Sequence, residues 1–194
     1  MNPAAGFALF DTAVGDCAVS WNPFGLTGVW LPDTSSDRLR ARLRRRHPRS
    51  QEVVPHGAVA AAVAAMTRLL LGERLDLLEV QLDESSLGPF DRSVYAAARA
   101  IAPGRVVTYA MLAARVGGMA CARAVGQSLG RNPFPIVVPC HRIVAANGHL
   151  GGFSAPGGAA TKRRLLEIED ARLDGVADLF DTAAASAASF VPAG

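Results

Sequence analysis

The arrangement of apolar and turn residues changes partway along the chain, and this change limits the fold more than any other feature of the sequence. The first third contains short segments that are apolar or alternate in polarity. Gly15-Asp16 and the run Asn-Pro-Phe-Gly at 22–25 separate them, and both combinations are typical of tight turns. We therefore expect antiparallel strands over 7–12, 17–21 and 26–31.

Two helices and one further strand are expected in the rest of this region. The first helix should extend over 36–46, and the second over 56–71, where a glycine follows. The segment 75–82 alternates weakly in polarity and could return to the sheet as a strand. Together these elements predict a first domain, residues 1–85, that combines a small sheet with helices.

The chain becomes helical after a loop over 83–89. Gly, alone or with Pro, follows each of the first three helices expected there, which is a common way for a helix to end. The two helices that Gly117-Gly118 joins match a helix-turn-helix, although short helix pairs also occur in domains that bind no nucleic acid. Helices are expected over 91–102, 109–116, 120–129 and 161–171. They form a second domain, 86–171, before an Ala-rich tail, 172–194, that we expect to be partly disordered.

Charge is distributed unevenly along the second domain. The net charge of the chain is only +3, but residues 102–164 contain no Asp or Glu. A solvated surface normally mixes both signs, so a basic segment without acids favours a polyanionic partner, nucleic acid above all. An arginine-rich genome is the alternative, since 19 of the 20 basic residues are Arg, but it does not account for the missing acids. The basic residues of the segment are Arg105, Arg115, Arg123, Arg131, Arg142, Lys162, Arg163 and Arg164.

A second group of arginines lies on the helix expected over 36–46. These side chains fall all round the helix and not on one face. We interpret this helix as solvated, with a second binding surface as the alternative. Its arginines are Arg38, Arg40, Arg42, Arg44, Arg45 and Arg46.

The tetrapeptide Pro139-Cys140-His141-Arg142 carries the clearest chemical signal. Cys140 lies between two apolar, strand-like runs, 134–138 and 143–146, and His141 follows it directly. A thiol on a rigid mount beside an imidazole has the ingredients of an activated thiolate. Free cysteine is also among the most buried residue types, so the pair alone fits plain packing as well.

Cysteine usage and hydropathy indicate the cellular compartment. Cys17, Cys121 and Cys140 cannot all pair within one chain, and their spacing suggests no disulfide framework. The longest apolar run, 58–66, is too short to span a membrane. The first residues carry no basic segment and meet Asp11 early, so we expect no signal peptide. We expect a cytoplasmic protein in a reducing environment, without a membrane partner.

The residues around Cys140 closely resemble the signature of the O6-alkylguanine-DNA alkyltransferases. The resemblance covers about residues 88–170, whereas residues 1–85 fit the family by element order alone. It implies an α+β fold, with a ribonuclease-H-like N-terminal domain and a mainly helical C-terminal domain that carries a helix-turn-helix. The matching motifs are Val107-Thr108-Tyr109, Ala122-Arg123-Ala124-Val125-Gly126, the run from Arg131 to Val144, Asn147-Gly148, Gly151-Gly152-Phe153-Ser154 and the run from Lys162 to Glu169.

The resemblance implies direct reversal of DNA damage. Members of this family flip an O6-alkylguanine, or an O4-alkylthymine, out of double-stranded DNA. They transfer the alkyl group irreversibly to their own cysteine, here Cys140, in a single turnover and without a cofactor. Binding is expected in the minor groove, largely independent of sequence, by a monomer whose cooperativity on DNA is left open.

The resemblance also assigns catalytic roles. His141 would take the thiol proton of Cys140 through a bridging water, and Glu169 would orient the imidazole and stabilise its charge. Tyr109 would donate toward N3 of the guanine, and Asn132 would tie the helix expected over 120–129, the recognition helix of the family, to the segment that carries Cys140. Without the family, Glu169 fits a surface helix, Tyr109 a packing residue and Asn132 an ordinary turn before proline.

Further residues are carried over as substrate and DNA contacts. Arg123 would fill the hole that the flipped base leaves in the stack, because a planar guanidinium can stack and donate hydrogen bonds at once. A phosphate contact is the plainer alternative for Arg123. The remaining DNA contacts are Thr108, Ala122, Ala124 and Gly126, and the alkylguanine pocket would be formed by Leu129, Ile143, Phe153 and Ser154, with Ser154 toward O6.

The chain departs from the family pattern in places. Phe153 replaces a tyrosine that is common there, Cys121 stands where alanine is common, and the loop 154–162 is about two residues longer, a change that loops generally tolerate. No metal is expected, because Cys17, His47 and His56 are too few and too poorly spaced for a zinc site. Two other functions stay open: lesion recognition without transfer, as in relatives that lack the acceptor cysteine, and a Cys-His hydrolase that turns over without DNA.

Overall fold

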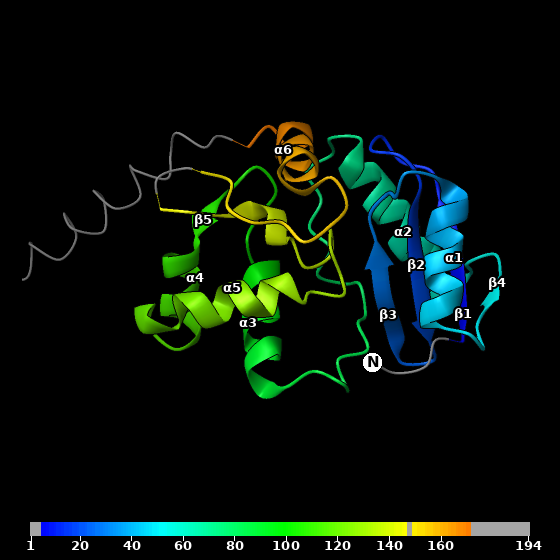
Figure 1. Ribbon diagram of the computed structural model, residues 1–194, viewed down its shortest axis with the longest axis horizontal. Coiled ribbons are helices and arrows are strands. Elements are labelled where there is room, and N and C mark those ends of the chain that lie inside the picture. Colours follow the sequence, from blue (N-terminus) through cyan, green and yellow to red (C-terminus); the bar gives the residue numbers. More distant parts are fainter. Residues whose placement is uncertain (1–4, 147–148, 172–194) are drawn as a thin grey trace, which may run out of the picture.

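A four-stranded sheet forms the first part of the molecule (Figure 1). The structure is a computed structural model that describes residues 5–146 and 149–171, so the expected tail and the Asn147-Gly148 motif lie outside the described residues. Its strand order is β3-β2-β1-β4, with antiparallel pairing among the first three strands, which confirms the strands expected there. The strands are β1 Gly6–Phe10, β2 Cys17–Asn22, β3 Gly25–Trp30 and β4 Gln51–Glu52.

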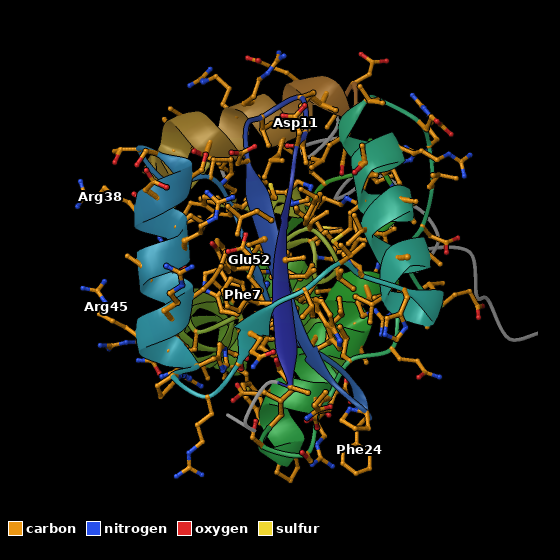
Figure 2. The ribbon with its side chains drawn as sticks, turned by 90° about the vertical axis from the view of Figure 1, so that its right-hand side faces the viewer. Phe7, Asp11, Phe24, Arg38, Arg45 and Glu52 are labelled. Carbon is orange, nitrogen blue, oxygen red and sulfur yellow. The ribbon has the colours of Figure 1, made fainter. Side chains whose placement is uncertain are left out.

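Two helices, α1 Ser36–Arg46 and α2 Gly57–Leu70, flank this sheet, as Figure 2 shows. Successive strand residues point to opposite faces. Phe7 of β1 accordingly packs with Leu39 and Leu43 of α1, while its neighbour Ala8 belongs to the larger core that α2 enters. Both helices agree with the sequence-based prediction.

The prediction of a strand over 75–82 is wrong. Only Leu82 makes an isolated bridge, to Leu26, and the fourth strand is β4, which pairs parallel with β1. Arg99 is the physical reason, because its Nη2 forms hydrogen bonds with three carbonyl oxygens that a strand would have used for pairing. It donates to the oxygens of Leu77, Leu78 and Val80 at 2.7, 2.6 and 2.9 Å.

Four α-helices form most of the second part. They confirm the expected helices with shifted ends: α3 ends at Arg99, and α5 begins at Ala122 because a 3-10 turn, η1 Met119–Cys121, precedes it. The order α4–η1–α5 fits a helix-turn-helix, whose DNA-reading role stays a prediction. The helices are α3 Pro89–Arg99, α4 Tyr109–Val116, α5 Ala122–Gly130 and α6 Gly158–Ile168.

The strand-like run 134–138 is not a strand but a turn with buried side chains. Prolines 133, 135 and 139 lack the N–H group that strand pairing needs, and Ile136 has a φ of 76°. Cys140 then begins a 3-10 helix, η2 Cys140–Arg142. Of the second run only β6 Ile143–Val144 is a strand, paired parallel with β5 Val107–Thr108.

One apolar core joins the two parts. It includes Val19 and Met66 from the first part and Val94, Leu112 and Val138 from the second. The backbone N–H of Val29 in β3 also donates to the carbonyl of Pro133 at 2.8 Å. The cysteine segment is therefore packed and hydrogen-bonded against the sheet. No helix in the described part of the chain is long and apolar enough to cross a membrane.

Candidate active site

The centre of the candidate site is a buried group of charged side chains, His141, Arg142 and Glu169. His141 Nε2 lies 2.9 Å from Glu169 Oε1. Arg142 binds the same carboxylate twice, from Nη2 to Oε1 at 2.7 Å and from Nε to Oε2 at 2.9 Å. All three residues are at most 6% exposed. Glu169 is therefore no surface helix residue, and the structure brings it to His141 as the resemblance implies.

Arg142 is the part of this arrangement that sequence reasoning missed. Its Nη1 donates to the carbonyl of Ile101 at 2.5 Å, so the guanidinium is fixed on both sides. A bidentate guanidinium is the geometry that holds a carboxylate ionised and in place. Burial by itself would raise the pKa of Glu169, but His141 and Arg142 outweigh burial and lower that pKa to about 2.

The protonation of His141 follows from its surroundings. Burial lowers its pKa, although the hydrogen bond and charge of Glu169 act in the opposite direction. A neutral imidazole that donates from Nε2 to Glu169 leaves Nδ1 as an acceptor. Nδ1 is buried and has no hydrogen-bond partner among the described residues. His141 can therefore take up one proton at Nδ1. It directly follows Cys140 in the sequence, so it is the candidate acceptor of the thiol proton.

Cys140 is half-buried at the start of η2. Burial raises the pKa of its thiol, while a hydrogen bond with Asn132 and the charge of Lys162 act against the rise. The resting side chain is therefore a thiol at neutral pH, and thiolate formation needs a base.

The side chain of Asn132 makes two hydrogen bonds to the backbone of the segment that leads to Cys140. Its Nδ2 donates to the carbonyl of Val138 at 2.9 Å, and its Oδ1 accepts from the N–H of Phe134 at 2.9 Å. These bonds close the turn between the end of α5 and Cys140. The catalytic importance of this turn stays a prediction.

Tyr109 lies beside Lys162, another residue to which sequence reasoning gave no role. Lys162 is fully buried, donates from Nζ to the carbonyl of Ile143 at 2.6 Å, and lies 5.8 Å from the centre of the Tyr109 ring. Burial lowers its pKa to about 8, against the effect of Cys140. A sequence signal was present, because Lys162 is the only lysine of the chain.

Glycines make room for the ring of Tyr109. A Cβ added at Gly151 would come within 3.3 Å of the ring, and one added at Gly126 within 3.8 Å. Gly126 therefore lies next to Tyr109, and its DNA contact stays a prediction. Thr108 is buried, and its hydroxyl accepts from the N–H of Met111 at 3.1 Å as the cap of α4. This leaves its predicted DNA contact without support in the structure.

Cys140 lines a cavity of about 190 Å³. Four other predicted residues, Leu129, Asn132, Phe153 and Ser154, line the same cavity, whereas Tyr109 and Ile143 do not. The first part of the molecule contributes β3 residues and Arg42 and Arg46 of α1, which the sequence gave no reason to place here. A larger cavity of about 350 Å³, between α2 and the β2–β3 turn, contains none of the predicted residues.

The expected DNA-binding surface lies on α5. Arg123 is exposed there and its neighbours Ala122 and Ala124 are half-exposed, while Val125 and Leu129 are buried. The basic surface is smaller than the sequence indicated, because two of the eight basic residues of the acid-free segment are buried. These two are Arg142 and Lys162.

Comparisons with known proteins agree with this site. Residues 89–171 match the family described as 6-O-methylguanine DNA methyltransferase, DNA binding domain. A methylated-DNA--protein-cysteine methyltransferase from Methanothermobacter thermautotrophicus is 32% identical over 160 residues, which are 82% of each chain. A DNA base-flipping protein from Thermus thermophilus is 36% identical over 152 residues, 78% of this chain and 99% of that protein.

Solved structures show the same fold. Mycobacterium tuberculosis OGT in complex with DNA has a TM-score of 0.67 and 31% identity, and the match covers 88% of this chain and 98% of that one. An O6-methylguanine-DNA methyltransferase from Pyrococcus kodakaraensis has a TM-score of 0.65 and 29% identity, with 84% and 98% covered. The chain therefore belongs to the family of the O6-alkylguanine-DNA alkyltransferases, the methylated-DNA--protein-cysteine methyltransferases.

Proposed function

We propose that this protein repairs DNA by transferring the alkyl group of O6-alkylguanine to Sγ of Cys140, once per molecule. The observation that carries the proposal is the buried His141–Glu169 pair, 2.9 Å apart, whose histidine directly follows a cysteine that lines a cavity. The names of the relatives, methylated-DNA--protein-cysteine methyltransferase and DNA base-flipping protein, support the same activity. O4-alkylthymine is a second substrate under this proposal.

Proton removal from Cys140 is the first step. An alkyl ether carbon is a poor electrophile, so the attacking sulfur must be a thiolate. His141 accepts the thiol proton at Nδ1, through a bridging water as the resemblance implies. Glu169 then faces an imidazolium and stabilises it, and Arg142 keeps Glu169 ionised and oriented.

Transfer of the alkyl carbon follows. The Sγ–C bond forms while the C–O6 bond breaks, and the electron pair of that bond moves to the guanine. Tyr109 donates a proton toward N3 of the leaving base. The product is a thioether on Cys140, and no base or nucleophile in this scheme removes the alkyl group again, so the reaction stops after one turnover.

DNA is the partner, and α5 with Arg123 is the proposed contact surface. Arg123 is exposed beside small side chains that allow a close approach to DNA. We propose minor-groove binding by a monomer, with little sequence dependence and with Arg123 in the place of the flipped base. The helix pair α4–α5 then acts as a helix-turn-helix of a domain 86–171, next to a ribonuclease-H-like domain 1–85.

Intact-mass measurement after incubation with an O6-methylguanine duplex tests the transfer. One methyl group per molecule is expected, absent in Cys140→Ser and retained in Cys17→Ser and Cys121→Ser. Repeated turnover, or a methyl group on Cys121, contradicts the proposal.

A base-flipping function without transfer is the second candidate, since a relative at 36% identity is named a DNA base-flipping protein. It predicts tight binding of the lesion duplex and an unchanged protein mass. Cys140 and its proton acceptor favour transfer over this candidate, and a Cys-His hydrolase would need neither Arg123 nor DNA.

A further inference from the structure

Helix α3 lies against α5 (Figure 1), and three hydrogen bonds join α3 to the C-terminal end of α5. The hydroxyl of Ser128 donates to Oδ1 of Asp91 at 2.5 Å, and Arg131 donates from Nη2 to the same oxygen at 3.1 Å. The hydroxyl of Tyr95 donates to the carbonyl oxygen of Ser128 at 3.0 Å. We call these four residues the α3–α5 clasp.

The polar groups of the clasp depend on one another. Ser128 and Tyr95 are buried, and a buried hydroxyl costs free energy unless it is hydrogen-bonded. Burial raises the pKa of Tyr95 to about 12, so its hydroxyl keeps the proton that it donates at neutral pH. Asp91 lies in the first turn of α3, where the helix dipole favours an acidic side chain. The carboxylate of Asp91 is therefore held ready for both of its donors.

Packing alone does not hold this side of α5. A cavity of about 210 Å³ lies beside the clasp, and Asp91, Tyr95 and Arg131 belong to its lining. Side chains that face a cavity lack part of the packing contacts that a filled interior provides. The hydrogen bonds of the clasp therefore fix the end of α5 where close packing does not.

The clasp lies between the expected DNA-binding surface and the acceptor cysteine. Leu129 directly follows Ser128 and lines the cavity beside Cys140. Arg123 lies on the exposed side of the same helix. Because a short helix moves as a unit, a shift at Ser128 changes the position of Arg123 relative to Cys140.

Resting on the transfer function proposed above, we propose that Asp91 is a positioning residue for transfer from duplex DNA. It acts through Ser128 and holds α5 in the orientation in which Arg123 fills the base stack while the flipped base reaches Cys140. A small misplacement far from the reacting atoms can slow a reaction strongly. A free alkylated base enters the cavity without contacts between α5 and DNA, so its transfer does not depend on Asp91.

Single-turnover rates on an O6-methylguanine duplex and on free O6-benzylguanine test this role. The duplex rate is measured with DNA binding saturated, so that a change in affinity does not affect it. Asp91→Ala should lower the duplex-to-free-base rate ratio about tenfold, the size of one charge-assisted hydrogen bond. Glu79→Ala removes the same charge from an exposed position of the first part and should leave the ratio unchanged.

Two conservative variants separate positioning from a purely structural role. Ser128→Ala removes one donor to Asp91, so it should lower the ratio in the wild-type background but not in Asp91→Ala, where the acceptor is already lost. Asp91→Asn keeps an acceptor for Ser128 and should retain part of the ratio. Thermal midpoints are measured for every variant, and where Asp91→Ala does not fold, Asp91→Asn and Ser128→Ala provide the same test.

The outcomes that overturn the proposal are distinct from failure of the proposed function. A lower thermal midpoint with an unchanged ratio would show that the clasp only stabilises the fold. Equal slowing on both substrates would also overturn the positioning role, and the transfer function would stand. If the wild-type protein accepts the alkyl group from neither substrate, the function proposed above is wrong, and the role of Asp91 falls with it.

Discussion

Two arginine–glutamate ion pairs lie in opposite surroundings. One is Arg142–Glu169, next to Cys140, and the other is Arg40–Glu52, between α1 and β4. Arg142 and Glu169 are each 4% exposed, whereas Arg40 and Glu52 are 35% and 33% exposed. Water screens the second pair, and such pairs contribute little to stability. The buried pair is costly to assemble and costly to break, and we interpret it as a device that fixes the ionisation of Glu169.

Breaking each pair from the arginine side gives the largest expected difference. Arg142→Met leaves Glu169 buried without its two-pronged partner and should lower the free energy of unfolding by about 3–5 kcal/mol. Arg40→Gln should lower it far less, because water screens this exposed pair. Denaturant unfolding of both variants measures the difference. Equal losses would show that burial does not distinguish the two pairs.

The pH dependence of stability sharpens the same comparison. The pKa of Glu169 is lowered from 4.5 to about 2 in the folded protein. Because the folded-state pKa is depressed, its contribution is fully present above about pH 4.5 and is lost as the pH falls from there to about 2. The full contribution is about 3 kcal/mol.

Stability measured between pH 6 and pH 2 in Glu169→Gln and in Glu52→Gln tests this assignment. The first variant should flatten the acid limb of the profile, and the second should leave its shape close to that of the wild type. A profile that Glu169→Gln leaves unchanged would place the acid sensitivity in other carboxylates.

His141 and Glu169 should act as one unit in transfer. The losses of transfer rate in His141→Ala and Glu169→Gln should then not multiply in the double variant, because either change already disables proton removal from Cys140. Single-turnover rates of the two single variants and the double variant measure this coupling. Independent roles would give a double loss equal to the product of the single losses.

The two regions also differ in how far the sequence predicts them. Local signals were sufficient for the first three strands and for α1 and α2, since turn residues, caps and alternation depend on near neighbours in the chain. The strand predicted over 75–82 failed because Arg99, a distant residue, binds its carbonyls. The strand predicted over 134–138 failed because apolar side chains indicate only that a segment is buried. The prolines in and beside this run lack the N–H groups that strand pairing needs.

The residues of the candidate site also differ in whether local sequence signals predict them. Cys140 and His141 are adjacent and carry their own signal, but the 29 positions to Glu169 left only the family resemblance to place it. The sequence places Arg142 among the basic residues of an expected DNA-binding surface, because it does not reveal which basic residues are buried. The approach of Arg42 and Arg46 to Cys140 depends on packing between the two parts, and no local pattern encodes that.

Replacing Arg123, on the exposed surface of α5, should give an effect of intermediate size. Flipping a base costs a few kcal/mol, and only the duplex reaction needs the gap in the stack to be filled. Arg123→Ala should therefore slow transfer from an O6-methylguanine duplex about tenfold to a hundredfold and leave transfer from free O6-benzylguanine close to the wild-type rate. Arg115→Ala, an exposed arginine of α4, serves as the control. Equal losses on duplex and free base would make Arg123 a residue of the fold.

The smallest effects come from two helix caps, one in each region. The hydroxyl of Ser35 accepts from the N–H of Arg38 at the start of α1, and that of Thr108 accepts from Met111 at the start of α4. Ser35→Ala and Thr108→Val should each lower the free energy of unfolding by about 1 kcal/mol, the usual contribution of a cap.

Only the second cap positions a residue with a proposed role in transfer, because Tyr109 is the first residue of α4. Thr108→Val should therefore slow transfer two- to fivefold, since about 0.4 to 1 kcal/mol of positioning is lost at Tyr109, whereas Ser35→Ala should leave the rate unchanged. DNA affinity, measured alongside, decides between the two roles of Thr108. A cap leaves affinity for undamaged duplex unchanged, because the buried hydroxyl does not reach the surface, while a DNA contact would weaken binding in Thr108→Val and restore the role that the family resemblance implies.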